Sequence, residues 1–287
     1  MGAPFEARLS KRYADLSGAL RGAADYLNSN PVDLATRTLR SVSRDSGISP
    51  AAFSRLARAL EYADIEELRE EFRTKIDRRV NNFAQRAERL HSDHRAGTAG
   101  FIDAHLTACQ SNLQSFVDTL DQAMLTAAIE QIEKARKVLL LGALGSTGVV
   151  EYLSYMASFC ADNWAMASRM GSSLGGGIAG LGGDDVLIIV TKPPFADRAI
   201  AAAKLAKQQG VYVVLITDTL GCPALKHASA WFVVPTESPH FYSSYVVTMF
   251  LVESLIGILV SRSGPTARTR IAEVEAANRD LAEVWDL

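Results

Sequence analysis

The chain has 287 residues, of which 48% are hydrophobic and 22% charged, with a formal net charge of −2. This length and balance fit one large or two modest globular domains and exclude intrinsic disorder. The charge is uneven, because residues 1–90 carry 16 Lys and Arg against 13 Asp and Glu, whereas the remainder is acidic. A basic amino-terminal part on an acidic body favours a small nucleic-acid-binding module attached to another domain.

Compartment and membrane signals are sparse. Cys109, Cys160 and Cys222 are far apart and form no CxxC pair, so we expect reduced thiols in the cytoplasm. The amino-terminal stretch MGAPFEARLSKRYADL lacks an apolar signal core. The longest apolar run, residues 245–260, is interrupted by Glu253 and falls short of the roughly 18 residues that a membrane helix needs. We expect this run to be a buried helix and the protein to have no membrane partner.

Helical spacing dominates the first part of the chain. Residues 5–28 are predicted to form one amphipathic helix that Asn30-Pro31 ends, with Asp33 capping the next segment. Further helices are expected at residues 34–46, 50–63 and 65–90. The small polar stretch 91–100 is typical of a linker. The expected domains are therefore an amino-terminal domain at 1–90, a linker at 91–100 and a second domain at 101–287.

The second part begins with a helical stretch at 101–136 and then changes to short apolar runs. These runs lie at residues 137–142, 164–168, 185–191, 211–217 and 230–235. Apolar runs without alternation indicate strands that are covered on both faces, as in a parallel sheet. Helical stretches such as 197–209 separate them. We therefore predict an α/β fold class, with an all-α amino-terminal domain joined to a five-stranded parallel doubly wound domain.

Residues 36–62 have the pattern of a helix-turn-helix. Gly47 permits the positive φ that a tight turn needs, Ser49 is a good N-cap, and Pro50 stands at the first helical position, where its missing N–H costs nothing. The apolar side chains expected to pack the two helices together are Val42, Ile48, Phe53 and Leu56. An ordinary αα-hairpin of a helical domain is the alternative interpretation.

The same segment is strongly basic, since residues 36–60 contain five Arg and one acidic residue. The second helix is expected to enter the major groove of double-stranded DNA with its amino-terminal half forward. We assign Arg55 and Ser54 to base edges. The remaining residues of the predicted DNA-binding set are Arg37, Arg40 and Arg58, which are expected at phosphates, and the cap residue Ser49.

The segment TLRSVSRDSGISPAAFSRLARALEY resembles the helix-turn-helix of RpiR-type (MurR/RpiR) bacterial transcription regulators. In that family a linker and a SIS (sugar isomerase) domain follow, a five-stranded parallel α/β fold that usually binds phosphorylated sugars. Residues 138–159, 185–190 and 199–219 are similar to the strands, serine loop and helices of such a domain. The resemblance implies a regulator and not an enzyme, controlled by a sugar, sugar phosphate or sugar acid. A symmetric homodimer or homotetramer is expected to grip the operator.

The effector is expected beyond the carboxyl ends of the strands. Gly145, Ser146 and Thr147 leave the first strand and open a helix, so their N–H groups and hydroxyls offer an anion cradle. A tight glycine turn with a serine cap is the alternative. The further predicted effector-binding residues are Ser172, Ser173, Thr191, Lys192 and His240. His240 is placed at the start of a helix beside this site, with a packed or surface histidine as the alternative.

One loop departs from the family pattern. SIS domains that bind sugar phosphates usually carry Ser-x-Ser-Gly-x-Thr after the third strand, whereas this chain has TKPPFA at residues 191–196. Pro193 and Pro194 remove two N–H donors, so a phosphate held in the usual way is not expected. Lys192 either supplies a compensating charge or is a solvated loop lysine.

Two other functions stay open. A sugar-phosphate aldose–ketose isomerase needs a base, for which Glu151, Glu237, Glu253 and His240 are the candidates. An oligomerisation scaffold without a working ligand site is the other. His91 and His94 have no further ligands at metal-binding spacing, so neither a metal ion nor a cofactor is expected.

Overall fold

The computed structural model describes residues 5–80, 83–92, 97–168, 171 and 173–285. Of the residues singled out above, Ser172 and His94 lie outside this set. The chain forms two compact units. The helical unit comprises residues 1–119 and 235–244, and the sheet unit comprises residues 120–234 and 245–287. The grouping therefore differs from the predicted domains, because the long helix after the expected linker and ten residues beyond the last strand belong with the amino-terminal helices.

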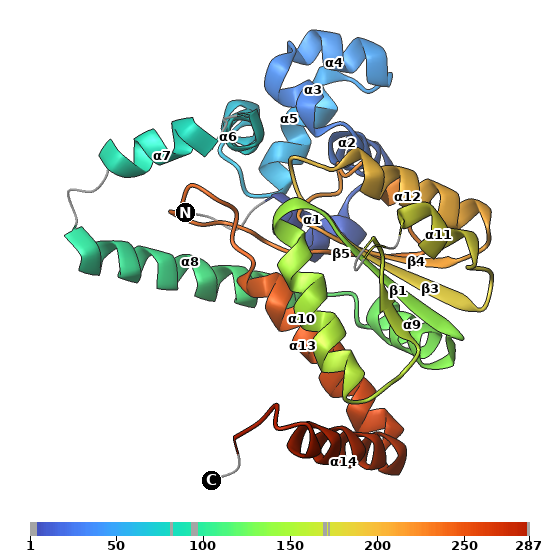
Figure 1. Ribbon diagram of the computed structural model, residues 1–287. Helices are drawn as coiled ribbons and strands as arrows, with labels where there is room; N and C mark the ends of the chain where they lie inside the picture. The colour runs from blue at the N-terminus through green and yellow to red at the C-terminus, as the bar shows by residue number, and fades with distance from the viewer. Residues whose placement is uncertain (1–4, 81–82, 93–96, 169–170, 172, 286–287) are drawn as a thin grey trace. The chain divides into compact units, whose positions relative to one another are not determined.

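The helical unit contains more and shorter helices than predicted (Figure 1). Its helices are α1 (Phe5–Arg12), α2 (Gly18–Ser29), α3 (Pro31–Thr36), α4 (Leu39–Ser46), α5 (Pro50–Ala59), α6 (Ile65–Val80), α7 (Phe83–Ser92) and α8 (Gly97–Thr119). The single helix predicted at 5–28 is wrong, because Leu16 and Ser17 are extended and separate α1 from α2. The helix predicted at 34–46 is also wrong. Arg37 and Thr38 are extended, and Thr38 caps α4 by accepting from Ser41.

Asp33 is not the cap that the sequence suggested. It lies inside the first turn of α3. Its carboxylate instead accepts hydrogen bonds from the Tyr26 hydroxyl at 2.5 Å and from Arg37 at 3.1 Å. Asp33 therefore ties α2 and α3 to the residue at which the chain turns into α4.

The connection between α4 and α5 forms as predicted. Gly47 has a φ of 69°, and the Ser49 hydroxyl accepts a hydrogen bond from the N–H of Ala52 at 3.3 Å. Pro50 is the first residue of α5. The turn between the helices is thus three residues long, the length typical of two helices that pack across each other.

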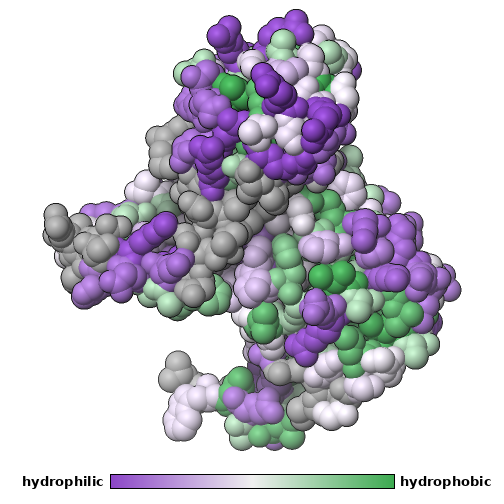
Figure 2. Space-filling view, turned by 90° about the horizontal axis from the view of Figure 1, so that it is seen from above, coloured by the Kyte–Doolittle hydropathy of each residue, from purple (hydrophilic) through white to green (hydrophobic). Residues whose placement is uncertain are grey.

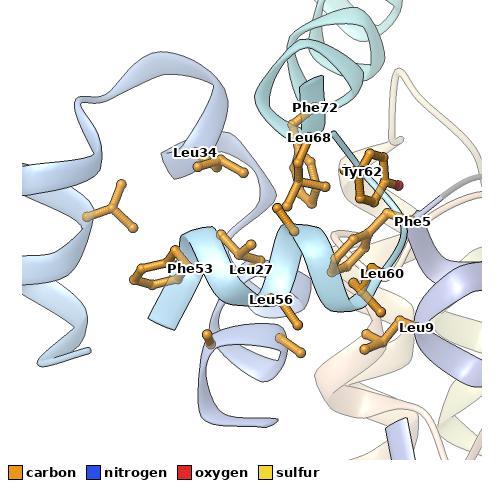
Figure 3. Close-up of a cluster of buried hydrophobic side chains, with 14 of the residues drawn as sticks. Phe5, Leu9, Leu27, Leu34, Phe53, Leu56, Leu60, Tyr62, Leu68 and Phe72 are labelled. Carbon is orange, nitrogen blue, oxygen red and sulfur yellow. The ribbon is translucent and has the colours of Figure 1, made fainter. Parts of the chain in front are cut away.

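A single apolar core holds this helical unit together. Figure 3 shows α5 running through its middle, with Phe53 towards one end of the helix and Leu60 towards the other. Val42, Phe53 and Leu56 are fully buried, and Ile48 packs against the same cluster. The predicted contacts between α4 and α5 are therefore confirmed. The buried residues of α5, Ala52, Phe53, Leu56 and Ala57, lie along one side of the helix, which fixes the face that remains exposed.

The sheet unit is a five-stranded parallel sheet with strand order β2-β1-β3-β4-β5. The strands are β1 (Lys137–Gly142), β2 (Trp164–Met166), β3 (Asp185–Val190), β4 (Tyr212–Thr217) and β5 (Ala230–Val233). All six residues of β3 are buried, as expected for a central strand covered on both faces. The predicted α/β fold is confirmed, and the order reverses between β1 and β3, where such sheets bind ligands.

Helices cover both faces of this sheet (Figure 1). The helices α11 (Leu174–Ala179) and α12 (Asp197–Gln208) lie on one face. The other face is covered by α9 (Gln122–Lys134), α10 (Thr147–Ser158) and α13 (Val246–Ser263), and α14 (Pro265–Asp280) follows α13. Hydrophilic residues make up much of the surface seen in Figure 2, with smaller hydrophobic patches between them.

Among the described residues, α13 is the helix that is long and apolar enough to cross a membrane by length and composition. The core helix of a globular domain passes the same test. Its 18 residues extend past the predicted run, and one side of the helix, including Leu251 and Leu255, is buried against α9 and α10. The expected buried helix is thus present, although only 39% of its apolar window lies inside the protein.

Candidate functional site

The exposed side of α5 carries the residues that the sequence assigned to DNA. Arg58 follows Ser54 by four residues and Arg55 by three, so it shares a face of the helix with both. Arg55 and Arg58 are exposed, and neither side chain makes a hydrogen bond or ion pair with any residue that the structure describes. The Ser54 hydroxyl donates to the carbonyl of Pro50 at 3.2 Å, which leaves its lone pairs available. Two uncommitted guanidinium groups therefore stand on the outer side of a rigid helix.

The predicted residues on and before α4 divide into two kinds. Arg40 is exposed. Arg37 instead donates to Asp33 and to the Ser41 hydroxyl and forms an ion pair with Asp45. The hydrogen bond to Asp45 raises the pKa of Arg37, and the same bond lowers the pKa of Asp45. The guanidinium group of Arg37 is thus engaged by side chains of the protein itself, which suits a structural role better than the predicted phosphate contact.

Sequence reasoning left Arg44 out of the DNA-binding set. Its side chain is 78% exposed, and its contact with Asp45 at 3.1 Å is an exposed ion pair of small energetic weight. Arg44 follows Arg40 by four residues, so the two cations lie on the same side of α4. The helical spacing of the two arginines was the signal that could have found it. Ser49, in contrast, is committed to capping α5.

A second candidate site lies at the carboxyl ends of β1, β3 and β4 in the sheet unit. β1 turns sharply into α10 at Gly142, where a Cβ would meet the Ser146 carbonyl and stand 2.7 Å from the Val150 side chain. This close approach requires glycine and brings Ser146 to the start of α10. Ser146 is 1% exposed, and its hydroxyl lies 3.0 Å from the hydroxyl of Tyr245, the residue that precedes α13.

Lys192 is the central cation of this second site. It is 5% exposed, so the solvated loop lysine that the sequence left open is wrong. Its Nζ donates to the Thr248 hydroxyl at 2.7 Å and stands 3.7 Å from the centre of the Tyr245 ring. Burial lowers the pKa of Lys192 to about 7, and the charge of Asp218 opposes that shift. A lysine placed in this way can hold an anion or donate hydrogen bonds to hydroxyl groups.

Tyr245, Thr248 and Asp218 belong to the second site but were missed from the sequence. Asp218 follows β4 directly, as Lys192 lies just beyond β3, so its position at the same edge of a parallel sheet could have revealed it. Tyr245 precedes the long apolar helix α13, far along the chain, and Thr248 lies in its first turn. No motif in the sequence linked them to Ser146 or Lys192.

The other predicted effector residues make fewer contacts at this site or lie away from it. Thr191 is buried beside Lys192, and Gly145 and Thr147 flank Ser146. Ser173 caps α11 by accepting from Gly176 at 3.0 Å. His240 belongs to the helical unit, and no helix begins there, because α13 starts at Val246. The helix start predicted at His240 is therefore wrong.

The carboxylates considered as catalytic bases are not gathered around Lys192. Glu253 is exposed and accepts a hydrogen bond from the Tyr152 hydroxyl at 3.1 Å. Glu237 is exposed and belongs to the helical unit with His240. Within the described residues, no group of three His, Cys, Asp or Glu could hold a metal ion. The arrangement at the sheet edge is thus suited to binding through one cation and several hydroxyls.

Residues 131–257 match the family model of the SIS domain. This part of the chain is a SIS domain. Comparison with curated proteins finds no match for the sequence. The fold resembles the sugar isomerase domain of an RpiR transcription factor from Sphaerobacter thermophilus, with a TM-score of 0.57 and 23% identity over 60% of this chain and 96% of that one.

Two further solved structures are similar. The NanR protein of Vibrio vulnificus, complexed with ManNAc-6P, has a TM-score of 0.56 and 19% identity, covering 96% of this chain and 98% of its own. A candidate sugar-phosphate isomerase from Listeria monocytogenes has a TM-score of 0.50 and 15% identity over 59% of this chain and 92% of its own. The predicted resemblance to RpiR-type regulators is confirmed for the SIS domain and its fold.

Proposed function

We propose that the protein is a transcription regulator of RpiR type, in which α4 and α5 form a DNA-binding helix-turn-helix. The observation that carries this proposal is the exposed face of α5, where Arg55 and Arg58 stand on a helix capped at its amino end by Ser49. Arg55 would reach base edges, and Arg58, Arg40 and Arg44 would contact phosphates.

The SIS domain supplies the effector site of this regulator. Lys192 and the hydroxyls of Ser146 and Thr248 favour a sugar, sugar phosphate or sugar acid. The similarity to NanR, a protein solved with ManNAc-6P, supports a sugar-related ligand. A cytoplasmic homodimer or homotetramer would present two helix-turn-helix modules to a symmetric operator.

Gel-shift assays on DNA from upstream of the protein's own gene test the DNA-binding function. Arg55→Ala should weaken binding about 5- to 150-fold, the effect of losing a base contact of about 1–3 kcal/mol. Arg279→Ala is the matched control, because it removes an exposed arginine of α14. Absence of specific binding by the wild-type protein would refute the proposal.

Thermal-shift screening tests the effector site. Sugars, sugar phosphates and sugar acids are compared on the wild-type protein and on Lys192→Met. A ligand of this site should stabilise the wild type and lose most of that effect in the variant. Equal stabilisation of both proteins would place the ligand elsewhere, and a panel without any stabilisation would favour a scaffold without a working ligand site.

A sugar-phosphate aldose–ketose isomerase is the second candidate. Lys192, whose pKa is lowered to about 7 by burial, is a group that can exchange protons near neutral pH, and the charge of the nearby Asp218 acts on it. The candidates Glu151, Glu237, Glu253 and His240 are distributed over both units. Turnover of a panel of sugar phosphates by the full-length protein would support this function, and loss of that turnover in Lys192→Met would locate it.

A further inference from the structure

The residues between β5 and α13 form a closed loop that belongs to the helical unit. The loop comprises residues 235–244, which lie within the SIS match but pack with the helical unit, whereas β5 before it and α13 after it are parts of the sheet unit. The N–H of Ser244 donates to the carbonyl of Thr236 at 3.1 Å, which ties the two ends of the loop together. Ser244 is also buried, with 7% of its surface exposed. The hydrogen bond therefore closes the loop at its base.

This loop is bound to α7 and α8 by side chains. Arg86 of α7 donates to the carbonyls of His240 at 3.3 Å and Tyr242 at 3.4 Å. The ring of Phe83 lies 4.8 Å from that of Tyr242 between centroids. Asn112 of α8, a buried residue, donates to the carbonyl of Glu237 at 2.7 Å. These contacts bind the loop to two helices of the helical unit, the unit that also contains α5.

The next residue in the chain, Tyr245, is held by the predicted effector site. Its hydroxyl lies 3.0 Å from that of Ser146, and its ring lies 3.7 Å from Nζ of Lys192. An anionic oxygen that took hydrogen bonds from Ser146 and Lys192 would compete with Tyr245 for both. Because Tyr245 is covalently continuous with Ser244, any displacement of Tyr245 acts on the closed loop.

We propose that the Ser146–Tyr245 contact couples the effector site to the DNA-binding unit, with residues 235–244 as the connecting element and α7 as its first recipient. An effector oxygen that replaces the Tyr245 hydroxyl at Ser146 releases the loop, and the contacts of Phe83 and Arg86 loosen in turn. This inference rests on the proposed function for the identity of the two sites. The coupling itself can be measured on the protein alone, in the absence of DNA.

Hydrogen–deuterium exchange of the full-length protein tests the coupling without a known effector. Tyr245→Phe and Ser146→Ala remove the same hydrogen bond from opposite sides. Tyr152→Phe is the matched control, because it removes another tyrosine hydroxyl contact between α10 and α13, the 3.1 Å bond to Glu253. Thermal unfolding checks that each variant is folded, and peptides from β4 serve as the internal reference.

Both test variants should raise exchange in peptides covering Phe83–Ser92 and residues 235–244 by about fivefold, the factor that corresponds to a hydrogen bond of about 1 kcal/mol. Tyr152→Phe should leave these peptides unchanged. Unchanged exchange in α7 in both test variants, or an equal rise in the control, overturns the coupling. Gel shifts on the wild type test the proposed function separately. If exchange rises but the protein does not bind DNA, the coupling is supported and only the proposed function as a transcription regulator is refuted.

Discussion

Replacing Lys192 with Met should change how the stability of the SIS domain depends on pH. Burial holds the pKa of Lys192 at about 7 in the folded protein, against 10.5 for an ordinary lysine. Between these values the unfolded chain binds a proton that the folded chain does not, so the free energy of unfolding rises with pH. At pH 7 and below, the folded protein carries a buried ammonium whose desolvation opposes folding.

The size of this effect follows from the shift. Each pH unit well above the folded pKa adds about 1.4 kcal/mol to the free energy of unfolding. From pH 7.0 to 8.5 the integrated gain is about 1.5 kcal/mol, because the lysine is still half charged at the start of the range. Lys192→Met removes this contribution and retains an unbranched side chain. The stability of the wild type relative to the variant should therefore increase by that amount.

Urea denaturation followed by tryptophan fluorescence measures the difference. Trp164, Trp231 and Trp285 all belong to the sheet unit, so the signal reports that part of the chain. Titrations of other groups cancel in the comparison at each pH. Lys226→Met is the matched control, because Lys226 is exposed in the turn before β5. Identical pH dependence in the wild type and Lys192→Met would refute the assignment of Lys192 as a buried, readily deprotonated amine.

Two further substitutions test the local geometry on which both sites depend. Gly142→Ala should destabilise the SIS domain by about 3 kcal/mol in urea denaturation, because the added Cβ would stand 2.7 Å from the Val150 side chain. Gly148→Ala, whose Cβ would meet nothing within 4 Å, should be nearly neutral, and equal losses in the two variants would contradict this account. Ser49→Ala should cost about 1 kcal/mol by removing the cap of α5. Thermal melts followed by circular dichroism measure that loss. An unchanged melting temperature would mean that the cap does not contribute to stability.

Most of the fold could be predicted because its signals are local. The buried strand β3 is a continuous apolar run, and Gly47, Ser49 and Pro50 carry the turn and cap chemistry of the α4–α5 connection. The breaks within the helices predicted at residues 5–28 and 34–46 were missed because their sequence signals are weaker. Ser17 and Thr38 stand directly before α2 and α4 with extended backbones, and Thr38 also accepts a hydrogen bond from Ser41, but helices tolerate both residue types, so the sequence did not mark these breaks.

The candidate effector site was only partly predictable for a different reason. Ser146 and Lys192 follow strands whose order the α/β pattern implies, so their positions at one edge could be anticipated. Tyr245 reaches them from the start of α13, 99 residues after Ser146, and no periodic pattern encodes that approach. The partners of Arg37 were equally hidden from the sequence. Its charge suggested DNA contact, whereas the structure shows its bonds to Asp33 and Asp45.

The salt dependence of DNA binding tests the central claim most directly. Fluorescence anisotropy with labelled upstream DNA gives the binding constant of the wild type and of Arg58→Ala between low and high salt. The logarithm of the constant should fall linearly with the logarithm of the salt concentration, and Arg58→Ala should reduce the slope by about 1 through the loss of one phosphate contact. Binding that is absent, independent of salt or unchanged in slope by Arg58→Ala would contradict a DNA-binding role for the exposed face of α5.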